Sequence, residues 1–88
     1  MNKERRKIIA TVVDRLNKIS ADVDEITSLI ESVADDEQEA YDNMPEGLQM
    51  SDRGDTMEEN ISTLQEQQSN LEDVVTTLSE VADALQEL

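Results

Sequence analysis

The stretch NMPEGLQMSDRGD, residues 43–55, contains the only proline and both glycines of an 88-residue chain. Pro45 lacks a backbone N–H and its ring clashes with the carbonyl four residues earlier, so a helix that approaches from the N-terminal side has to end before it. Gly54 offers a position where a positive φ costs little, and Asp55, with Glu58 three residues later, suits the N-cap of a second helix. The stretch therefore predicts a chain reversal between two helices, with one short helical turn starting at Pro45.

The segments on either side of this stretch carry apolar residues at alternating spacings of three and four. The first run is Ile9, Val12, Leu16, Ile19, Val23, Ile26, Ile30 and Val33, and it continues in weaker form through Glu37, Ala40 and Met44. The second run is Met57, Ile61, Leu64, Gln68, Leu71, Val75, Leu78, Ala82 and Leu85. This alternation is typical of the buried seam between helices of a coiled coil or bundle. We predict one all-α domain over 1–88, an antiparallel two-helix hairpin with helices over 3–42 and 55–87 and a turn over 43–54.

Apolar residues outside the two seams indicate that a single hairpin does not complete the core. They are Ile8, Leu29, Val74, Val81 and Leu88 at g-type heptad positions, and Val13 at an e-type position. So wide a stripe is typical of a bundle, and each such side chain left in water forfeits about 1.5–3 kcal/mol. We predict self-association into a homodimer or larger helical bundle. The alternative is a monomer whose stripe is covered by a different protein.

One polar residue, Gln68, occupies a core position of the second run. It has two interpretations. The side chain is partly exposed, or it pairs with its symmetry mate in an oligomer and fixes the register, as buried polar residues at such positions do.

The formal net charge is −15, from 22 acidic and seven basic residues, and six of the seven basic residues lie within the first 18. Direct binding to nucleic acid is disfavoured, because phosphate contact needs clustered positive charge. The natural partner of such a chain is a basic protein surface. Folding back near residue 48 is expected to bring the basic N-terminal turns beside Glu80, Asp83, Glu87 and the C-terminal carboxylate.

The residue inventory argues against catalysis. The chain has no Cys and no His, so the usual nucleophile and base pairs, zinc ligands and disulfides are missing. The acidic run from Asp35 fails as a calcium loop because its sixth residue is Ala40 rather than Gly. We therefore predict no enzyme activity, no cofactor and no metal site.

The first residues, MNKERRK followed by IIATVV, are too short in their apolar part for a signal peptide, and no stretch is long enough to span a membrane. A cytoplasmic protein is expected. In that setting the tripeptide Arg53-Gly54-Asp55, which matches an integrin-binding motif, is interpreted as turn chemistry.

Acidic and apolar side chains gather near the predicted turn and form the candidate partner-binding site. Its residues are Asp35, Asp36, Glu39, Tyr41, Met44, Leu48, Met50, Arg53, Glu58 and Glu59. One interpretation is an apolar plug that closes the end of the hairpin, since Met fills irregular gaps. The other is a contact patch with Tyr41 as its anchor and the acids around it orienting a basic partner. Rows of acids on two long helices also resemble the phosphate rows of a duplex, which raises the possibility of nucleic-acid mimicry.

The segment EAYDNMPEGLQMSDRGDTMEENISTLQ, residues 39–65, resembles a segment of small, acidic, uncharacterised bacteriophage and prophage proteins that are expected to form two helices. The shared pattern is N-x-P-E-x-L-Q followed by S-x-R-G and M-E-E. Here it falls on Asn43, Pro45, Glu46, Leu48, Gln49, Ser51, Arg53, Gly54, Met57, Glu58 and Glu59. The resemblance covers about a third of the chain. It implies an accessory protein of a mobile element, acting in a bacterial host, and it carries no catalytic residue.

The sequence favours a binding function. We expect a phage-type accessory protein that engages or inhibits a host or defence protein through its acidic surface. The alternative is a structural coiled-coil element, such as a scaffold or assembly component.

Overall fold

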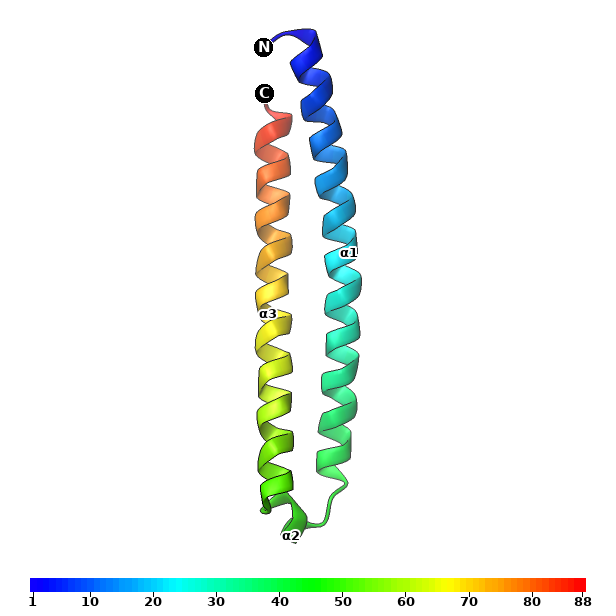
Figure 1. Ribbon diagram of the computed structural model, residues 1–88, viewed down its shortest axis with the longest axis vertical. Coiled ribbons are helices and arrows are strands. Elements are labelled where there is room, and N and C mark those ends of the chain that lie inside the picture. The colour runs from blue at the N-terminus through cyan, green and yellow to red at the C-terminus, as the bar shows by residue number, and fades with distance from the viewer.

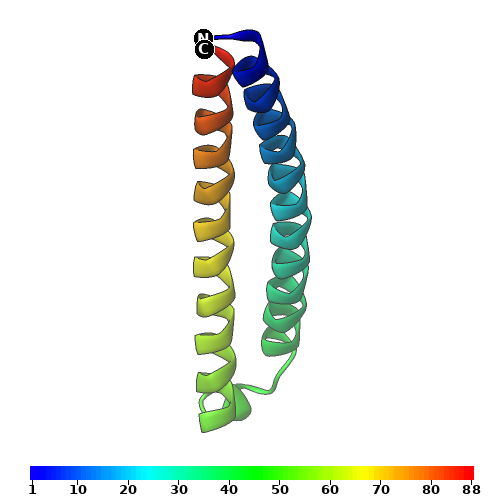
Figure 2. The same ribbon diagram turned by 45° about the horizontal axis from the view of Figure 1, so that its top comes forward.

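The computed structural model describes residues 1–88 as two long helices joined by a short one. α1 spans Lys3–Asp42, α2 spans Glu46–Gln49 and α3 spans Asp52–Gln86. α1 and α3 lie side by side and antiparallel, α2 closes the turn, and both termini lie at the opposite end (Figures 1 and 2). The molecule is a rod of 68 × 14 × 14 Å. The prediction of an all-helical protein is confirmed.

Local chemistry sets the ends of α1. The side chain of Asn2 accepts a hydrogen bond of 2.8 Å from the backbone N–H of Arg5, which satisfies one of the free donors of the first turn. At the other end, the N–H of Asn43 still bonds to the carbonyl of Glu39, and the chain then leaves the helix ahead of Pro45. Pro45 has φ −55° and its carbonyl accepts from the N–H groups of Leu48 and Gln49, which starts α2.

The prediction of Asp55 as the N-cap of the second long helix is wrong. α3 begins at Asp52, and its N-cap is Ser51, whose hydroxyl accepts a hydrogen bond from the N–H of Gly54. Gly54 thus lies inside the first turn of α3, and no glycine in the chain has a positive φ. Its absence of a side chain serves a close approach instead, since a Cβ there would lie 2.0 Å from the carbonyl oxygen of Gln49.

The second heptad run faces α1 as the sequence predicts. Every member, from Met57 to Leu85, is buried or half-buried in the seam between the two helices.

The first heptad run is only half right. Ile9, Leu16, Val23 and Ile30 are half-buried, but Val12, Ile19, Ile26 and Val33 are exposed. Their neighbours Val13, Thr27 and Ala34 are buried and Ser20 is half-buried, so α1 turns this row toward α3 instead. Small and polar side chains in this row let the helices approach closely, and the hydroxyl of Thr27 is satisfied by the carbonyl of Val23 at 2.8 Å.

This rotation gives the hairpin two unlike flanks. One flank of α1 carries Val12, Ile19, Ile26 and Val33, each of which comes directly before a residue of the row that faces α3. Because the helices run antiparallel, the equivalent positions of α3 lie on the same side, and they are Asn60, Gln67, Val74 and Val81. We call these eight residues the apolar flank. The opposite side, the polar flank, consists of Ala10, Asn17, Asp24, Glu31 and Gln38 on α1 and of Glu58, Gln65, Glu72, Ser79 and Gln86 on α3.

The core of the single hairpin is thin. Only six of its 88 residues are buried, and none of its large side chains is fully enclosed. Even the Leu and Ile residues of the seam, apart from Ile61, keep part of their surface in contact with solvent. Two helices alone therefore leave much of the apolar stripe uncovered.

Candidate binding surface at the turn end

Hydrogen bonds between α1, α2 and α3 fix the turn end of the rod. The side-chain amide of Gln49 donates to the backbone carbonyl of Tyr41 at 2.8 Å, and the hydroxyl of Tyr41 donates to the carboxylate of Glu58. On α1, the amide of Gln38 donates to Asp42 at 2.9 Å. These contacts hold the last turn of α1 against both following helices, so the acidic residues around them project from a defined frame.

Tyr41 is therefore part of this frame. It is half-buried, and its hydroxyl is engaged by Glu58. The hydrogen bond to the Glu58 carboxylate raises the pKa of Tyr41 above its ordinary value, and the nearby charges of Glu58, Asp55 and Asp42 act in the same direction. Both effects favour the neutral phenol, because ionisation would remove the donated proton and add a negative charge among carboxylates.

The acids of the candidate site lie together at this end and are exposed. Asp35, Asp36 and Glu39 project from the last turns of α1, and Glu58 and Glu59 from the second turn of α3. No ion pair neutralises any of them. The only ion pair in the molecule joins Lys18 to Asp14 at 3.1 Å, and both side chains are largely exposed.

Two apolar side chains are exposed at the tip itself. Leu48 and Met50 are 46% and 75% exposed, whereas Met44 and Met57 are half-buried. The expected cluster thus divides into two parts. Tyr41, Met44 and Met57 contribute to the frame, and Leu48 and Met50 are free to contact a partner, with Arg53 exposed nearby as the only basic residue of this end.

The residues predicted for self-association are placed in different environments. Ile8, Leu29, Val74 and Val81 are exposed, whereas Val13 is buried and therefore packs inside the hairpin. Gln68 is half-buried in the seam. Sequence reasoning missed the row of Val12, Ile19, Ile26 and Val33 as an outer surface. Its signal was the row of Ser20, Thr27 and Ala34 one position later, whose small size favours the closer contact.

The basic N-terminal turns lie at the same end of the rod as the end of α3, as expected (Figure 1), but they form no ion pairs with it. No ion pair links the basic side chains at the start of α1 to Glu80, Asp83 or Glu87. Glu80 and Glu87 occupy the positions of α3 that point away from the seam, so the two sets of charges share an end of the rod without facing each other. The Arg6 side chain instead donates to the carbonyl of Met1.

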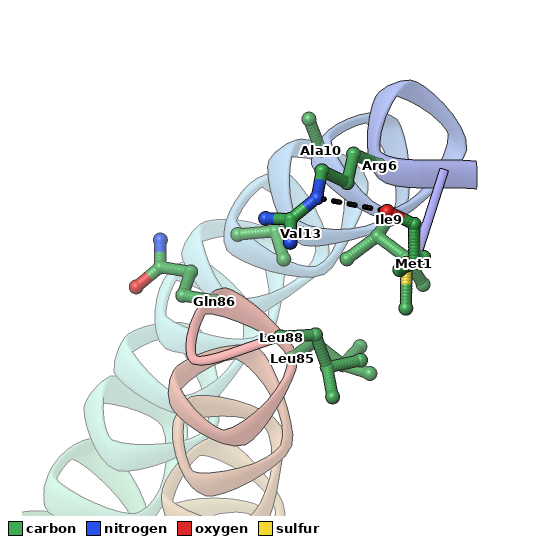
Figure 3. A pocket seen from close by; sticks show the side chains of 8 residues that line it. All are labelled: Met1, Arg6, Ile9, Ala10, Val13, Leu85, Gln86 and Leu88. Carbon is green, nitrogen blue, oxygen red and sulfur yellow. Dashed lines mark hydrogen bonds between the residues drawn. The ribbon is translucent and has the colours of Figure 1, made fainter. Parts of the chain in front are cut away.

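The termini end contains an apolar hollow of about 290 Å³ (Figure 3). Ile9 and Val13 of α1 lie on one side of it, Leu85 and Leu88 on the other, and Met1 and Arg6 at its rim. A second, smaller hollow on the polar flank is lined by Tyr41, Glu58 and Gln65 among others. No group of three metal-ligating side chains is close enough to hold a metal ion, and none of the helices combines the length and the apolar character that crossing a membrane needs.

The chain matches no protein-family model, and no curated protein or solved structure is similar enough to count as a relative. What the protein binds is therefore inferred from its own surface.

Proposed function

We propose that the protein is a non-catalytic binding protein that self-associates and docks on a basic protein surface through its turn end. Three features support this function: exposed acids without ion-pair partners, the exposed tip residues Leu48 and Met50, and a hydrogen-bonded frame beneath them. The acids would attract and orient the partner, and the tip would supply apolar contact once the complex has formed. The observation that carries the proposal is the absence of any ion pair in the acidic region.

The distribution of charge sharpens this point. Residues 23–66, the half of the rod nearer the turn, contain fourteen acidic residues against Arg53 alone, whereas the other half contains eight acidic and six basic residues. Charges of one sign in one place destabilise a folded protein by mutual repulsion. A basic partner would neutralise part of that charge. The relief of repulsion would then contribute to the free energy of binding.

Two variants of equal charge test the proposal. The turn-end variant carries Asp35→Asn, Asp36→Asn, Glu39→Gln and Glu59→Gln. The control carries Asp22→Asn, Asp73→Asn, Glu72→Gln and Glu80→Gln, which are also exposed but lie elsewhere on the rod. Glu58 is left unchanged in both because it bonds to Tyr41.

The partner is first captured from bacterial lysate at low salt, and its association rate with each variant is then measured at two salt concentrations. The turn-end variant should associate more slowly and with less salt dependence, and the control should resemble the wild type. Equal rates for the two variants would place the binding site elsewhere.

We further propose the setting that the resemblance to phage proteins implies: an accessory protein acting in the cytoplasm of a bacterial host against a host or defence protein. Loss of partner binding after neutralisation of the turn end, with the fold retained, supports inhibition of that kind. Loss after disruption of the helix seam alone would instead favour the structural alternative, a scaffold or assembly component.

Nucleic-acid mimicry is a second candidate, and the shape of the rod limits it. A net charge of −15 over 68 Å gives about one charge per 4.5 Å, against about one per 1.7 Å along duplex DNA. A dimer of the same length would carry about one charge per 2.3 Å, which comes close to the duplex. Mimicry therefore requires the self-associated form, and competition with duplex DNA for a DNA-binding partner would test it.

A further inference from the structure

The apolar flank is a row of exposed apolar residues that runs along most of the rod without a partner in the hairpin. Its α1 row, Val12, Ile19, Ile26 and Val33, repeats every seven residues and is 37–54% exposed. Its α3 row is apolar only in the half of the rod near the termini, where Val74 and Val81 lie, and it becomes Gln67 and Asn60 toward the turn. A row that keeps a strict heptad period on the outside of a hairpin indicates contact with another helix.

The charge pattern decides how a second hairpin would lie on this flank. Two copies stacked with their turn ends together would place the two acidic halves, each with fourteen acids, side by side. Two copies stacked in opposite directions would instead place the turn half of each beside the termini half of the other, which has six basic and eight acidic residues. Since like charges repel and opposite charges attract across such an interface, the opposed arrangement is favoured.

The apolar residues agree with this orientation. When two flanks meet in opposite directions about a two-fold axis, α1 lies on α1 of the other copy and α3 lies on α3. Val12 then meets Val33 of the second copy, and Ile19 meets Ile26. With turn ends together, α1 would lie on α3 instead, at the height set by the contacts of Tyr41 with Glu58, so Val33 would face the amide of Gln67 and only Ile19 and Ile26 would face apolar residues, Val81 and Val74.

The same alignment brings charges of opposite sign together. Extending the row of Val12 by seven residues adds Arg5, and the pairing of 12 with 33 places Arg5 against Ala40 of the second copy, one helical turn from Asp36. The basic first turns of α1, which find no ion pair within the hairpin, would thus meet acids that also have none.

We infer that the apolar flank binds a second copy of this chain, with the two rods antiparallel and α1 packed on α1 in a four-helix bundle. This refines the self-association proposed above and is separate from the docking of a basic partner. Of the acids at the turn end, Asp36 borders the apolar flank, whereas the tip residues and the acids Asp35, Glu39, Glu58 and Glu59 lie away from it and stay exposed in this dimer, so both bindings are compatible.

Labelling at single introduced cysteines tests the orientation, because the chain has none of its own. A donor dye is attached to Met50→Cys at the turn end, and acceptor dyes are attached in separate preparations to Leu88→Cys at the termini end and to Met50→Cys. The Förster distance is chosen shorter than the 68 Å rod. After subunits are mixed, the antiparallel dimer gives high transfer for the Met50–Leu88 pair and low transfer for the Met50–Met50 pair. The reverse pattern would overturn the inference.

A matched pair of lysine variants tests the flank. Ile26→Lys places a charge on the apolar flank, and Asn17→Lys places the same charge on the polar flank. Both lower the net negative charge equally, so repulsion between copies changes equally. Because two copies of Ile26 are buried per dimer, Ile26→Lys should raise the dimer dissociation constant by about 100-fold or more, and Asn17→Lys should change it little. Equal effects would show that the flank is not the interface.

Sedimentation equilibrium separates the possible failures. A folded monomer at micromolar concentration would overturn self-association itself, and a different protein would then be the occupant of the flank. That result would leave the proposed docking of a basic partner at the turn end untouched, because the association rates of the acid variants measure it independently. A dimer in which the dye pairs report turn ends together would overturn the orientation alone.

Discussion

A Cβ atom on Gly54 would lie 2.0 Å from the carbonyl oxygen of Gln49 and 2.8 Å from its Cα. The first turn of α3 therefore packs directly on the backbone that ends α2, and any side chain at residue 54 would push the two apart. Gly47, the other glycine of the turn, has nothing within 4 Å of the place where a Cβ would be. The two glycines of one turn thus have opposite structural roles.

Gly54→Ala should destabilise the hairpin because the overlap is with backbone atoms, which move only if the whole turn shifts. We expect a loss of about 1–3 kcal/mol, the usual cost of forcing extra atoms into a packed site. For a domain of this size the melting temperature should fall by about 4–8 °C per kcal/mol. Thermal unfolding followed by circular dichroism measures it.

Gly47→Ala is the matched control. Gly47 is in α2 with an ordinary helical backbone and open space around it, so Ala should hold or raise stability, by up to about 1 kcal/mol. Equal losses for Gly47→Ala and Gly54→Ala would mean that the turn tolerates no substitution at all, rather than a clash at one point.

Replacing Ala34 or its neighbour Val33 with leucine should change the free energy of unfolding by different amounts. Ala34 is 3% exposed in the seam, so Ala34→Leu should overpack it and cost about 1–3 kcal/mol. Val33→Leu, on the apolar flank, should cost much less. Urea denaturation at a protein concentration low enough to avoid self-association compares the two. The reverse order would show that α1 turns its other row toward α3.

The Tyr41 hydroxyl should titrate above its ordinary pKa, because it donates a hydrogen bond to Glu58 among nearby carboxylates. Tyr41 is the only tyrosine and the chain has no tryptophan, so ultraviolet absorbance follows this one group. Glu58→Gln should move the midpoint back toward 10. An unchanged midpoint would mean that the contact with Glu58 does not persist in solution.

The same contact makes stability depend on pH in the alkaline range. A group whose pKa is raised on folding contributes stability that is fully present below its unfolded value and is lost as the pH rises through its folded value. The stability difference between wild type and Tyr41→Phe should therefore be constant from neutral pH to about 10 and should shrink above it. Chemical denaturation at several pH values tests this, and a difference that grows above pH 10 would contradict it.

Salt should stabilise the protein. One exposed ion pair, Lys18 with Asp14, stands against a net charge of −15, so screening removes far more repulsion than attraction. The melting temperature should rise with added sodium chloride, whereas Lys18→Ala should change stability by no more than about 0.5 kcal/mol. A melting temperature that falls with salt would contradict this, because it would require more stabilising ion pairs than the single one that the hairpin contains.

The sequence predicts where the chain reverses, but not where α3 begins. The end of α1 before Pro45 follows from covalent geometry, which acts whatever the surroundings. The start of α3 does not, because Ser51, Asp52 and Asp55 are all good N-cap residues. The choice of Ser51 depends on how α2 packs against α3, where Gly54 admits the backbone of Gln49.

The candidate site shows the same division. The order of the residues alone places the acids on both sides of the turn. Only the structure separates Tyr41, engaged by Glu58 and by Gln49, from the exposed Leu48 and Met50, because exposure depends on which side chains the three helices enclose.

The sequence by itself determined that this chain forms two long helices, where it reverses, and which face of the second helix is buried. The helices and the reversal depend on local chemistry. The buried face of the second helix follows from its heptad pattern, because that helix has only one apolar row that runs its whole length. The tertiary structure alone decided which side of α1 meets α3. Ile9, Leu16, Val23 and Ile30 are followed on one side by an apolar row and on the other by a row of small residues that begins with Val13, and a seam with the same heptad period can form on either side. Close packing chose the side of Ser20, Thr27 and Ala34, because small side chains let two helices approach, and it left the row of Val12, Ile19, Ile26 and Val33 outside.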